Sequence, residues 1–237
     1  MDMSFYTASV GAQSQQGKLD IVSNNIANSN TVGFKSLNTV FSDLVYKNIH
    51  LPADEETDLL RGSGAKVDKT NILFSKGGYD ETGGLYDFCI KDEGFFCVED
   101  VATGERKYTI SGNFMPCTMP DGTMYLGTSD ADFIIGEDNQ PIFLDVFNEE
   151  AIMTQPGIFQ FDRKDRLLTD EGTFFTSIDD EQPQMIQGTV LNGVLEGSNM
   201  NLAEEMTKVI EAQRTYQYAL KMVQTSDEIQ NMFNTLR

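Results

Sequence analysis

The C-terminal stretch limits the fold of this chain more than any other feature of the sequence. Residues 198–237 contain neither Pro nor Gly, and apolar side chains recur along them at the three- and four-residue spacing of one helix face. Asn201, followed three residues later by Glu204, has the form of an N-cap with its acidic partner. The stretch predicts a helix of roughly 35 residues, about 50 Å long at ~1.5 Å of rise per residue. A helix of this length needs a packing partner along its surface.

Two apolar stripes are the predicted contact faces of the terminal helices. An N-terminal helix is expected to begin with Ser4 as its N-cap and to end in the Asn-rich segment 24–30. Its stripe consists of Phe5, Ala8, Ala12, Leu19, Val22 and Ile26. The C-terminal stripe consists of Leu202, Met206, Val209, Gln213, Tyr216, Leu220 and Val223, and drifts to Ile229, Met232 and Leu236. Two alternatives stay open: the chain pairs its own two helices, or neighbouring copies in an assembly complete the stripes.

The middle of the chain has the pattern of short β-strands. Aromatic and β-branched residues are mixed in segments that turn-forming pairs such as Gly77-Gly78 and Gly83-Gly84 separate. The predicted strands are Tyr86–Ile90, Gly94–Glu99, Lys107–Ile110, Thr123–Leu126 and Thr173–Ile178. Short strands with frequent turns favour an antiparallel sheet or an irregular barrel.

The predicted fold class is therefore α+β, with long N- and C-terminal helices forming a coiled-coil-like layer and a central antiparallel β-rich domain. The expected division has an N-terminal helical region, a connector, a central β-domain and a C-terminal helix. Their expected bounds are 1–47, 48–62, 63–192 and 193–237.

Charge separates the ends of the chain from its middle and excludes several classes of partner. The net charge is −20, and residues 49–195 carry 10 Lys and Arg against 28 Asp and Glu. The near-neutral ends are expected to pack against protein while the acidic middle faces water. Nucleic acid and anionic membrane surfaces are unfavourable partners for such a chain. The sequence shows neither a secretory signal in its first 20 residues nor a run of the ~18–20 apolar residues that a membrane-spanning helix requires.

No motif in the sequence predicts catalysis, a cofactor or a metal. The acidic pairs are adjacent in sequence, so on a strand their side chains point to opposite faces. Asp130 and Asp132 imitate the start of a calcium loop, but Ile135 stands where glycine is needed. Cys89, Cys97 and Cys117 lack the spacing of zinc ligands and are expected to be small buried residues. Whether two of them form a disulfide stays open.

The two ends of the chain carry motifs that closely resemble those of the bacterial flagellar rod and hook protein family. Residues 19–35, LDIVSNNIANSNTVGFK, resemble the N-terminal signature of that family. Residues 193–206, GVLEGSNMNLAEEM, continued by 210–217 and 224–228, resemble its C-terminal signature. Residues 92–96 and 108–114 resemble elements of its β-domain more weakly.

This resemblance implies a structural subunit of the flagellar rod that is not an enzyme and has no cofactor. The family forms a helical tube that transmits torque from the motor to the hook and encloses an export channel. Implied partners are further copies of the chain, adjacent rod and hook proteins, and the flagellar type III export apparatus. The implied location is the basal body outside the cytoplasmic membrane, reached without a cleaved signal peptide.

The resemblance also adds Asn28, Gly33 and Phe34 to the two stripes as expected subunit-interface residues. Chain length favours the rod over the hook, and the segment Phe41–Tyr46 favours the distal rod over the proximal rod. One alternative is a hook or hook-junction protein of the same family. The other is a secreted β-domain that binds or cleaves glycan, with its terminal helices serving as a dimerisation stalk.

Overall fold

The computed structural model of the chain describes residues 3–48, 60–101, 103–144, 154–170, 172–178 and 182–236. These residues form two compact units. The helical unit comprises Met1–Ala27, Leu37–Leu73 and Met200–Arg237, and the β unit comprises Asn28–Ser36 and Phe74–Asn199. Most of the predicted connector, residues 49–59, lies outside the described residues.

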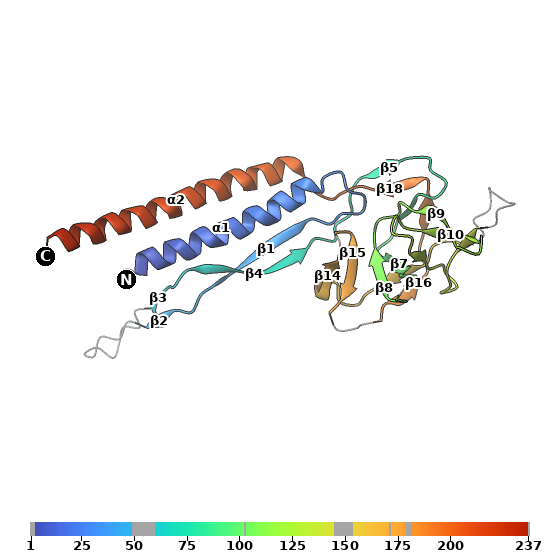
Figure 1. Cartoon of the computed structure of the whole chain (residues 1–237), viewed down its shortest axis with the longest axis horizontal. Coiled ribbons are helices and arrows are strands. Elements are labelled where there is room, and N and C mark those ends of the chain that lie inside the picture. Colours follow the sequence, from blue (N-terminus) through green and yellow to red (C-terminus); the bar gives the residue numbers. More distant parts are fainter. Residues whose placement is uncertain are drawn as a thin grey trace. The chain divides into compact units, whose positions relative to one another are not determined.

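The helical unit contains two antiparallel helices and a long β-hairpin (Figure 1). Helix α1 spans Met3–Ala27 and helix α2 spans Leu202–Thr235. The hairpin pairs β1 with β4 in antiparallel register, and β2 pairs with β3 nearer its tip. These strands are β1 (Leu37–Asp43), β2 (Lys47–Asn48), β3 (Leu60–Arg61) and β4 (Ala65–Ile72). Helix α1 lies between α2 and the hairpin, and the Ser14 hydroxyl donates a 2.7 Å hydrogen bond to the Ala65 carbonyl of β4.

The predicted coiled-coil-like layer is wrong, although the α+β class fits. The buried residues of α2 are Glu205, Ala212 and Ser226, which are small or polar. Leu202, Met206 and Leu220 of the predicted stripe are exposed instead. The physical reason is that α1 packs against α2 on one side and against the hairpin on the other. It therefore uses small residues such as Ala12 and Ser14 at its contacts and leaves no room for a continuous seam of large apolar side chains.

The two predicted helix starts have different outcomes. Asn201 is the N-cap of α2, as predicted, because its side chain accepts a 3.1 Å hydrogen bond from the Ala203 amide. The predicted length is also confirmed, since α2 has 34 residues. Ser4 is not an N-cap, because α1 already includes Met3, and the Ser4 hydroxyl lies 3.1 Å from the Ser226 hydroxyl of α2. Boundaries of helices commonly shift by one or two residues between prediction and structure.

The β unit is built from short strands that all pair in antiparallel fashion. Its main sheet has ten strands, with β7 and β10 each pairing with three others. Two smaller sheets join β17 to β6 and β18 to β5. The strands and the 3-10 turn of the described part of this unit are β5 (Tyr79–Glu81), β6 (Phe88–Ile90), β7 (Phe95–Glu99), β8 (Arg106–Thr109), β9 (Met115–Thr118), β10 (Met124–Gly127), β11 (Phe133–Ile134), β12 (Phe143–Leu144), β13 (Ile158–Gln160), η1 (Lys164–Arg166), β14 (Leu167–Asp170), β15 (Phe174–Ser177), β16 (Gln184–Ile186), β17 (Val190–Asn192) and β18 (Val194–Glu196).

Large apolar side chains fill the core of the β unit. Its central cluster consists of Phe88, Ile90, Phe96, Val98, Phe114, Leu126, Ile134, Ile142 and Ile158. Beside it, the ring of Phe95 makes edge-to-face contacts with the rings of Phe161 and Phe175, with centroids 5.5–5.6 Å apart. Each of the five predicted strands coincides, within two residues, with a strand of the structure. The alternation of aromatic and β-branched residues with turns was therefore a sound guide to this unit.

Candidate assembly interface

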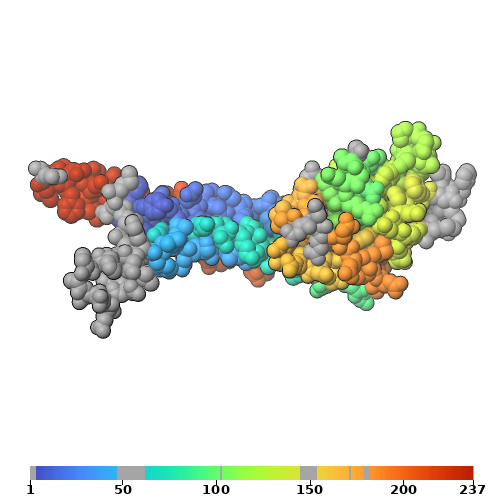
Figure 2. Space-filling view, turned by 90° about the horizontal axis from the view of Figure 1, so that it is seen from below, coloured from blue at the N-terminus to red at the C-terminus, as the bar shows by residue number. Residues whose placement is uncertain are grey.

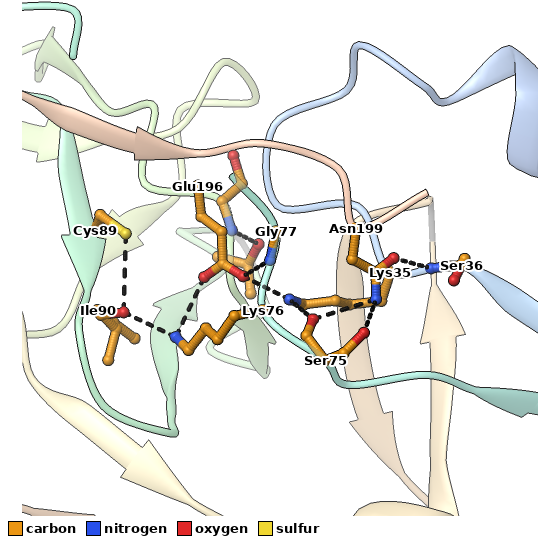
Figure 3. Close-up of polar contacts among 11 residues, drawn as sticks. Lys35, Ser36, Ser75, Lys76, Gly77, Cys89, Ile90, Glu196 and Asn199 are labelled. Carbon is orange, nitrogen blue, oxygen red and sulfur yellow. Dashed lines mark hydrogen bonds and ion pairs between the residues drawn. The ribbon is translucent and has the colours of Figure 1, made fainter. Parts of the chain in front are cut away.

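The two terminal motifs meet inside the chain rather than on its surface. In the β unit, the Lys35 ammonium lies 2.6 Å from a Glu196 carboxylate oxygen, and their side chains are only 2% and 1% exposed (Figure 3). Lys35 also donates to the Ser75 carbonyl at 2.8 Å. The other Glu196 oxygen lies 3.2 Å from the ammonium of Lys76. The Gly77 amide donates to Glu196 at 3.0 Å, so this carboxylate accepts hydrogen bonds from Lys35, Lys76 and Gly77.

Burial and charge act against each other at this ion pair. Burial alone would raise the pKa of Glu196. The hydrogen bonds from Lys35 and Gly77 and the charges of Lys35 and Lys76 outweigh it, so the pKa lies below its ordinary value. Burial lowers the pKa of Lys35, and its hydrogen bond with Glu196 offsets part of that shift. The pair is thus a charged, hydrogen-bonded centre that needs both partners.

Backbone contacts complete the junction between the two motifs in the β unit. The Gly33 amide donates to the Glu196 carbonyl at 2.7 Å, and Ser36 donates through its amide to the Asn199 side chain at 2.8 Å. Gly33 has a φ of +70°, and a Cβ atom there would lie 2.4 Å from the Ser111 amide nitrogen. Only glycine satisfies both conditions. Gly33 and Phe34 are therefore packed into the core of their own chain.

A second buried polar centre joins the motifs in the helical unit. Asn25 in α1 donates to the Leu37 carbonyl at 2.8 Å and to the Glu205 carboxylate of α2 at 3.2 Å. The Leu37 amide donates back to the side-chain oxygen Oδ1 of Asn25 at 2.9 Å. Lys208 neutralises Glu205 at 2.6 Å. One asparagine thus fixes the end of α1, the start of β1 and the first turns of α2.

The predicted interface residues separate into three groups by exposure. Ala12, Val22, Gly33 and Phe34 are buried within the chain. The half-buried residues are Ala8, Leu19, Ile26, Asn28, Val209, Tyr216 and Val223. The exposed residues are Phe5, Leu202, Met206, Gln213 and Leu220. The predicted C-terminal stripe therefore combines a row that faces α1 with a row that faces away from it.

The outer side of α2 carries further large apolar residues. Exposed side chains that the predicted stripe lacked are Ile210, Tyr218, Met222 and Phe233, besides the drifting Ile229, Met232 and Leu236. Leu202, Met206 and Ile210 are spaced four residues apart, so the sequence itself indicates that they lie together on one side of the helix. All residues from 227 to 236 are exposed, and this end of α2 extends past the start of α1 (Figure 2). Exposed apolar surfaces are common at protein–protein interaction sites.

Nothing among the described residues resembles a catalytic or metal centre. No cluster of His, Cys, Asp or Glu there could hold a metal ion. The three cysteines are free thiols, which closes the question of a disulfide in this structure. Neither of the described helices has a window apolar enough to cross a bilayer.

Comparison with known proteins agrees with the terminal motifs. Residues 5–35 match the family described as flagella basal body rod protein, and residues 191–236 match the C-terminal family of the flagellar basal body rod proteins FlgEFG. FlgG of Bacillus subtilis strain 168 is 30% identical over 266 residues, covering 99% of both chains. FlgG of Borreliella burgdorferi is 29% identical over 100% of this chain and 99% of its own.

A second rod protein name occurs among the relatives. FlgF of Caulobacter vibrioides is 30% identical over 97% of this chain and 95% of its own. The match extends through the β unit as well as the terminal motifs. With relatives of this identity aligned over nearly their whole length, the chain belongs to the family of flagellar basal-body rod proteins.

Proposed function

We propose that this protein is a structural subunit that polymerises into the helical tube of the flagellar rod. In this proposal the tube transmits torque from the motor to the hook and encloses an export channel. The protein has no enzymatic role. Its partners are further copies of itself, adjacent rod and hook proteins, and the flagellar type III apparatus that exports it without a cleaved signal peptide to the basal body.

The observation that carries this proposal is the apolar outer face of α2. The helix already has an intramolecular partner in α1, yet Leu202, Met206 and Ile210 stay exposed on its outer side. Farther along, Met232 and Phe233 are exposed as well, at 58% and 70%. In an isolated subunit these apolar side chains are exposed to water, which is unfavourable. Contact with a neighbouring copy would bury them.

The proposed contact joins two different surfaces of neighbouring copies. The outer face of α2 has no matching duplicate on the outer side of α1, where Phe5 and Tyr6 are the large exposed apolar residues among those described. Contact between unlike surfaces is heterologous, and a heterologous contact that does not close produces an open helical filament. We therefore assign the subunit interface to the exposed members of the predicted set and to the other large apolar residues exposed on α2. The first are Phe5, Leu202, Met206, Gln213 and Leu220, and the second are Ile210, Tyr218, Met222, Ile229, Met232, Phe233 and Leu236.

The buried members of the predicted set have another role in this proposal. Ala12 and Val22 are buried in the helical unit, and Gly33 and Phe34 are buried in the β unit, so in this proposal they stabilise the fold of the subunit itself. Each unit has its own buried polar contact, Asn25 with Glu205 in the helical unit and Lys35 with Glu196 in the β unit. Such contacts within each unit support the proposed load-bearing role, because they resist deformation of that unit.

The test is polymerisation of the purified full-length chain, measured by sedimentation across a concentration series and by electron microscopy. We expect tubes or rods above a critical concentration. Leu220→Asp should abolish them, because the interface would bury an unpaired carboxylate. Lys221→Asp, at the adjacent exposed position, is the matched control and should assemble at nearly the wild-type concentration.

Both variants should unfold within about 0.5 kcal/mol of the wild type, since both positions are exposed in the monomer. Absence of wild-type polymer at every concentration would contradict the proposal. Equal loss of assembly in Leu220→Asp and Lys221→Asp would contradict the assignment of the interface to this face.

A further inference from the structure

Three methionines lie in the exposed apolar rows of α2. Met206, Met222 and Met232 have exposed fractions of 56%, 55% and 58%. Met206 stands four residues from both Leu202 and Ile210, which are also exposed. Met222 follows Tyr218 by four residues, and Met232 precedes Leu236 by four. Each thioether therefore belongs to an apolar helix row while being open to solvent in the monomer.

The cysteines of the chain are poor competitors for an oxidant. Cys89 and Cys97 are buried, and burial raises their pKa values to about 11 and about 12, so both are thiols at neutral pH. Cys117 is half-buried, with its Sγ 3.7 Å from the Thr128 carbonyl. The methionines of α2 are thus the sulfur atoms most accessible to a dissolved oxidant among the residues of the proposed interface.

We propose that Met206, Met222 and Met232 form an oxidation site at which hydrogen peroxide stops the unassembled subunit from polymerising. Each thioether sulfur attacks one peroxide oxygen, the O–O bond breaks, and a sulfoxide and water result. The sulfur loses two electrons and the peroxide gains them, so no further reactant is needed. The proposal rests on the proposed self-assembly of the chain.

Oxidation of these methionines would weaken the contact between subunits. A sulfoxide is polar and accepts hydrogen bonds, whereas the thioether packs as an apolar side chain. Burial of the sulfoxide against an apolar neighbour that offers no hydrogen-bond donor costs free energy and therefore weakens the contact between subunits. Once a polymer has formed, the same side chains are shielded from peroxide, so sensitivity is confined to the free subunit. Methionine sulfoxide reductases reverse the change.

The experiment compares peroxide-treated and untreated full-length protein by sedimentation, with sulfoxides located by peptide mass spectrometry. Treatment should raise the critical concentration at least tenfold, which corresponds to about 1.4 kcal/mol per subunit. Incubation with methionine sulfoxide reductases A and B should restore assembly. The variant M206L/M222L/M232L should assemble with or without treatment, because leucine conserves the apolar volume.

Met115 and Met185 in the β unit supply the control. They are 42% and 39% exposed, so M115L/M185L should remain as sensitive to peroxide as the wild type. Preformed polymer should gain sulfoxide at Met115 and Met185 but resist it at the three α2 positions. Unchanged assembly after complete oxidation of α2 would overturn this inference alone. Failure of untreated protein to polymerise would overturn the proposed function, and this inference with it.

Discussion

The two units of this protein bury different kinds of side chain. The β unit excludes water from large residues such as Phe96 and Leu126, both completely buried. The helical unit buries Ala12, Ala212 and Ser226 between its helices, while large apolar residues of α2 remain outside. The β unit therefore has the core of an independent domain, whereas the helical unit has a narrow seam and an apolar exterior.

The difference indicates where each unit obtains its stability. Burial of apolar area contributes roughly 25 cal/mol per Å², so a core of phenylalanine and isoleucine stabilises the β unit without help. The seam of α1 and α2 offers less apolar area and depends on polar contacts such as Asn25 with Glu205. In the proposed assembly, the neighbouring copy would supply the remaining burial. Three substitutions test this contrast.

The largest effect is expected from Phe96→Ala. Phe96 is fully buried in the central cluster, and its ring lies 5.2 Å from the ring of Phe114 in an edge-to-face contact. Its removal should leave a cavity and destabilise the β unit by about 3–5 kcal/mol. Hydrogen exchange followed by mass spectrometry should show lost protection in β7, with α2 changed much less. Equal loss of protection in both would show that the two units unfold together.

The next effect is expected from Glu196→Gln. Without the carboxylate, the buried Lys35 ammonium loses its counter-charge, and we expect a loss of about 3 kcal/mol at pH 7 in denaturant unfolding. The amide oxygen of glutamine can still accept from Gly77, which limits the loss. Lys164→Gln, at the exposed ion pair with Glu93, is the matched control and should cost under about 1 kcal/mol.

The effect of Glu196→Gln on the unfolding free energy should depend on pH. Because the pKa of Glu196 is lowered in the folded protein, the unfolded chain takes up the proton first as the pH falls below the ordinary value of 4.5. The stability due to this carboxylate is complete above that pH and is lost as the pH falls through the folded pKa. The difference in unfolding free energy between wild type and Glu196→Gln should therefore shrink in acid. A constant difference from pH 7 to pH 3 would contradict this account.

The sequence predicted the parts of the fold that local patterns determine. The N-cap at Asn201, the length of α2 and the strands of the β unit each follow from neighbouring residues, and the structure agrees. The expected bounds of the four regions, which are 1–47, 48–62, 63–192 and 193–237, stay a prediction.

Long-range pairing could not be derived in the same way. Strand β1 follows the N-terminal motif without a clear alternating pattern, and it pairs with β4 across residues 44–64, a connection too long for a tight hairpin turn to predict the pairing. The sequence does not reveal that the hairpin packs on α1. It therefore predicts a coiled coil of the two helices, with the large apolar residues of α2 at the contact between them. Lys35 and Glu196 are 161 residues apart, and no spacing rule relates them. The spacing of the exposed row through Ile210 is visible in the sequence. It can be recognised as a second apolar face of α2 only when the face that contacts α1 is already known.

The smallest effect is expected from Ala212→Leu, which tests the seam directly. Ala212 is buried between α2 and α1, and the larger side chain should overpack that contact and cost about 1–3 kcal/mol of stability. Gln213→Leu, one position away on the exposed side, should leave the unfolding free energy within about 0.5 kcal/mol. Both are measured by denaturant unfolding at concentrations that keep the chain monomeric. If the helices were joined by a broad apolar interface instead of a narrow one, leucine at 212 would be tolerated or stabilising. Stability at or above wild type in Ala212→Leu would therefore contradict the contrast between the two units.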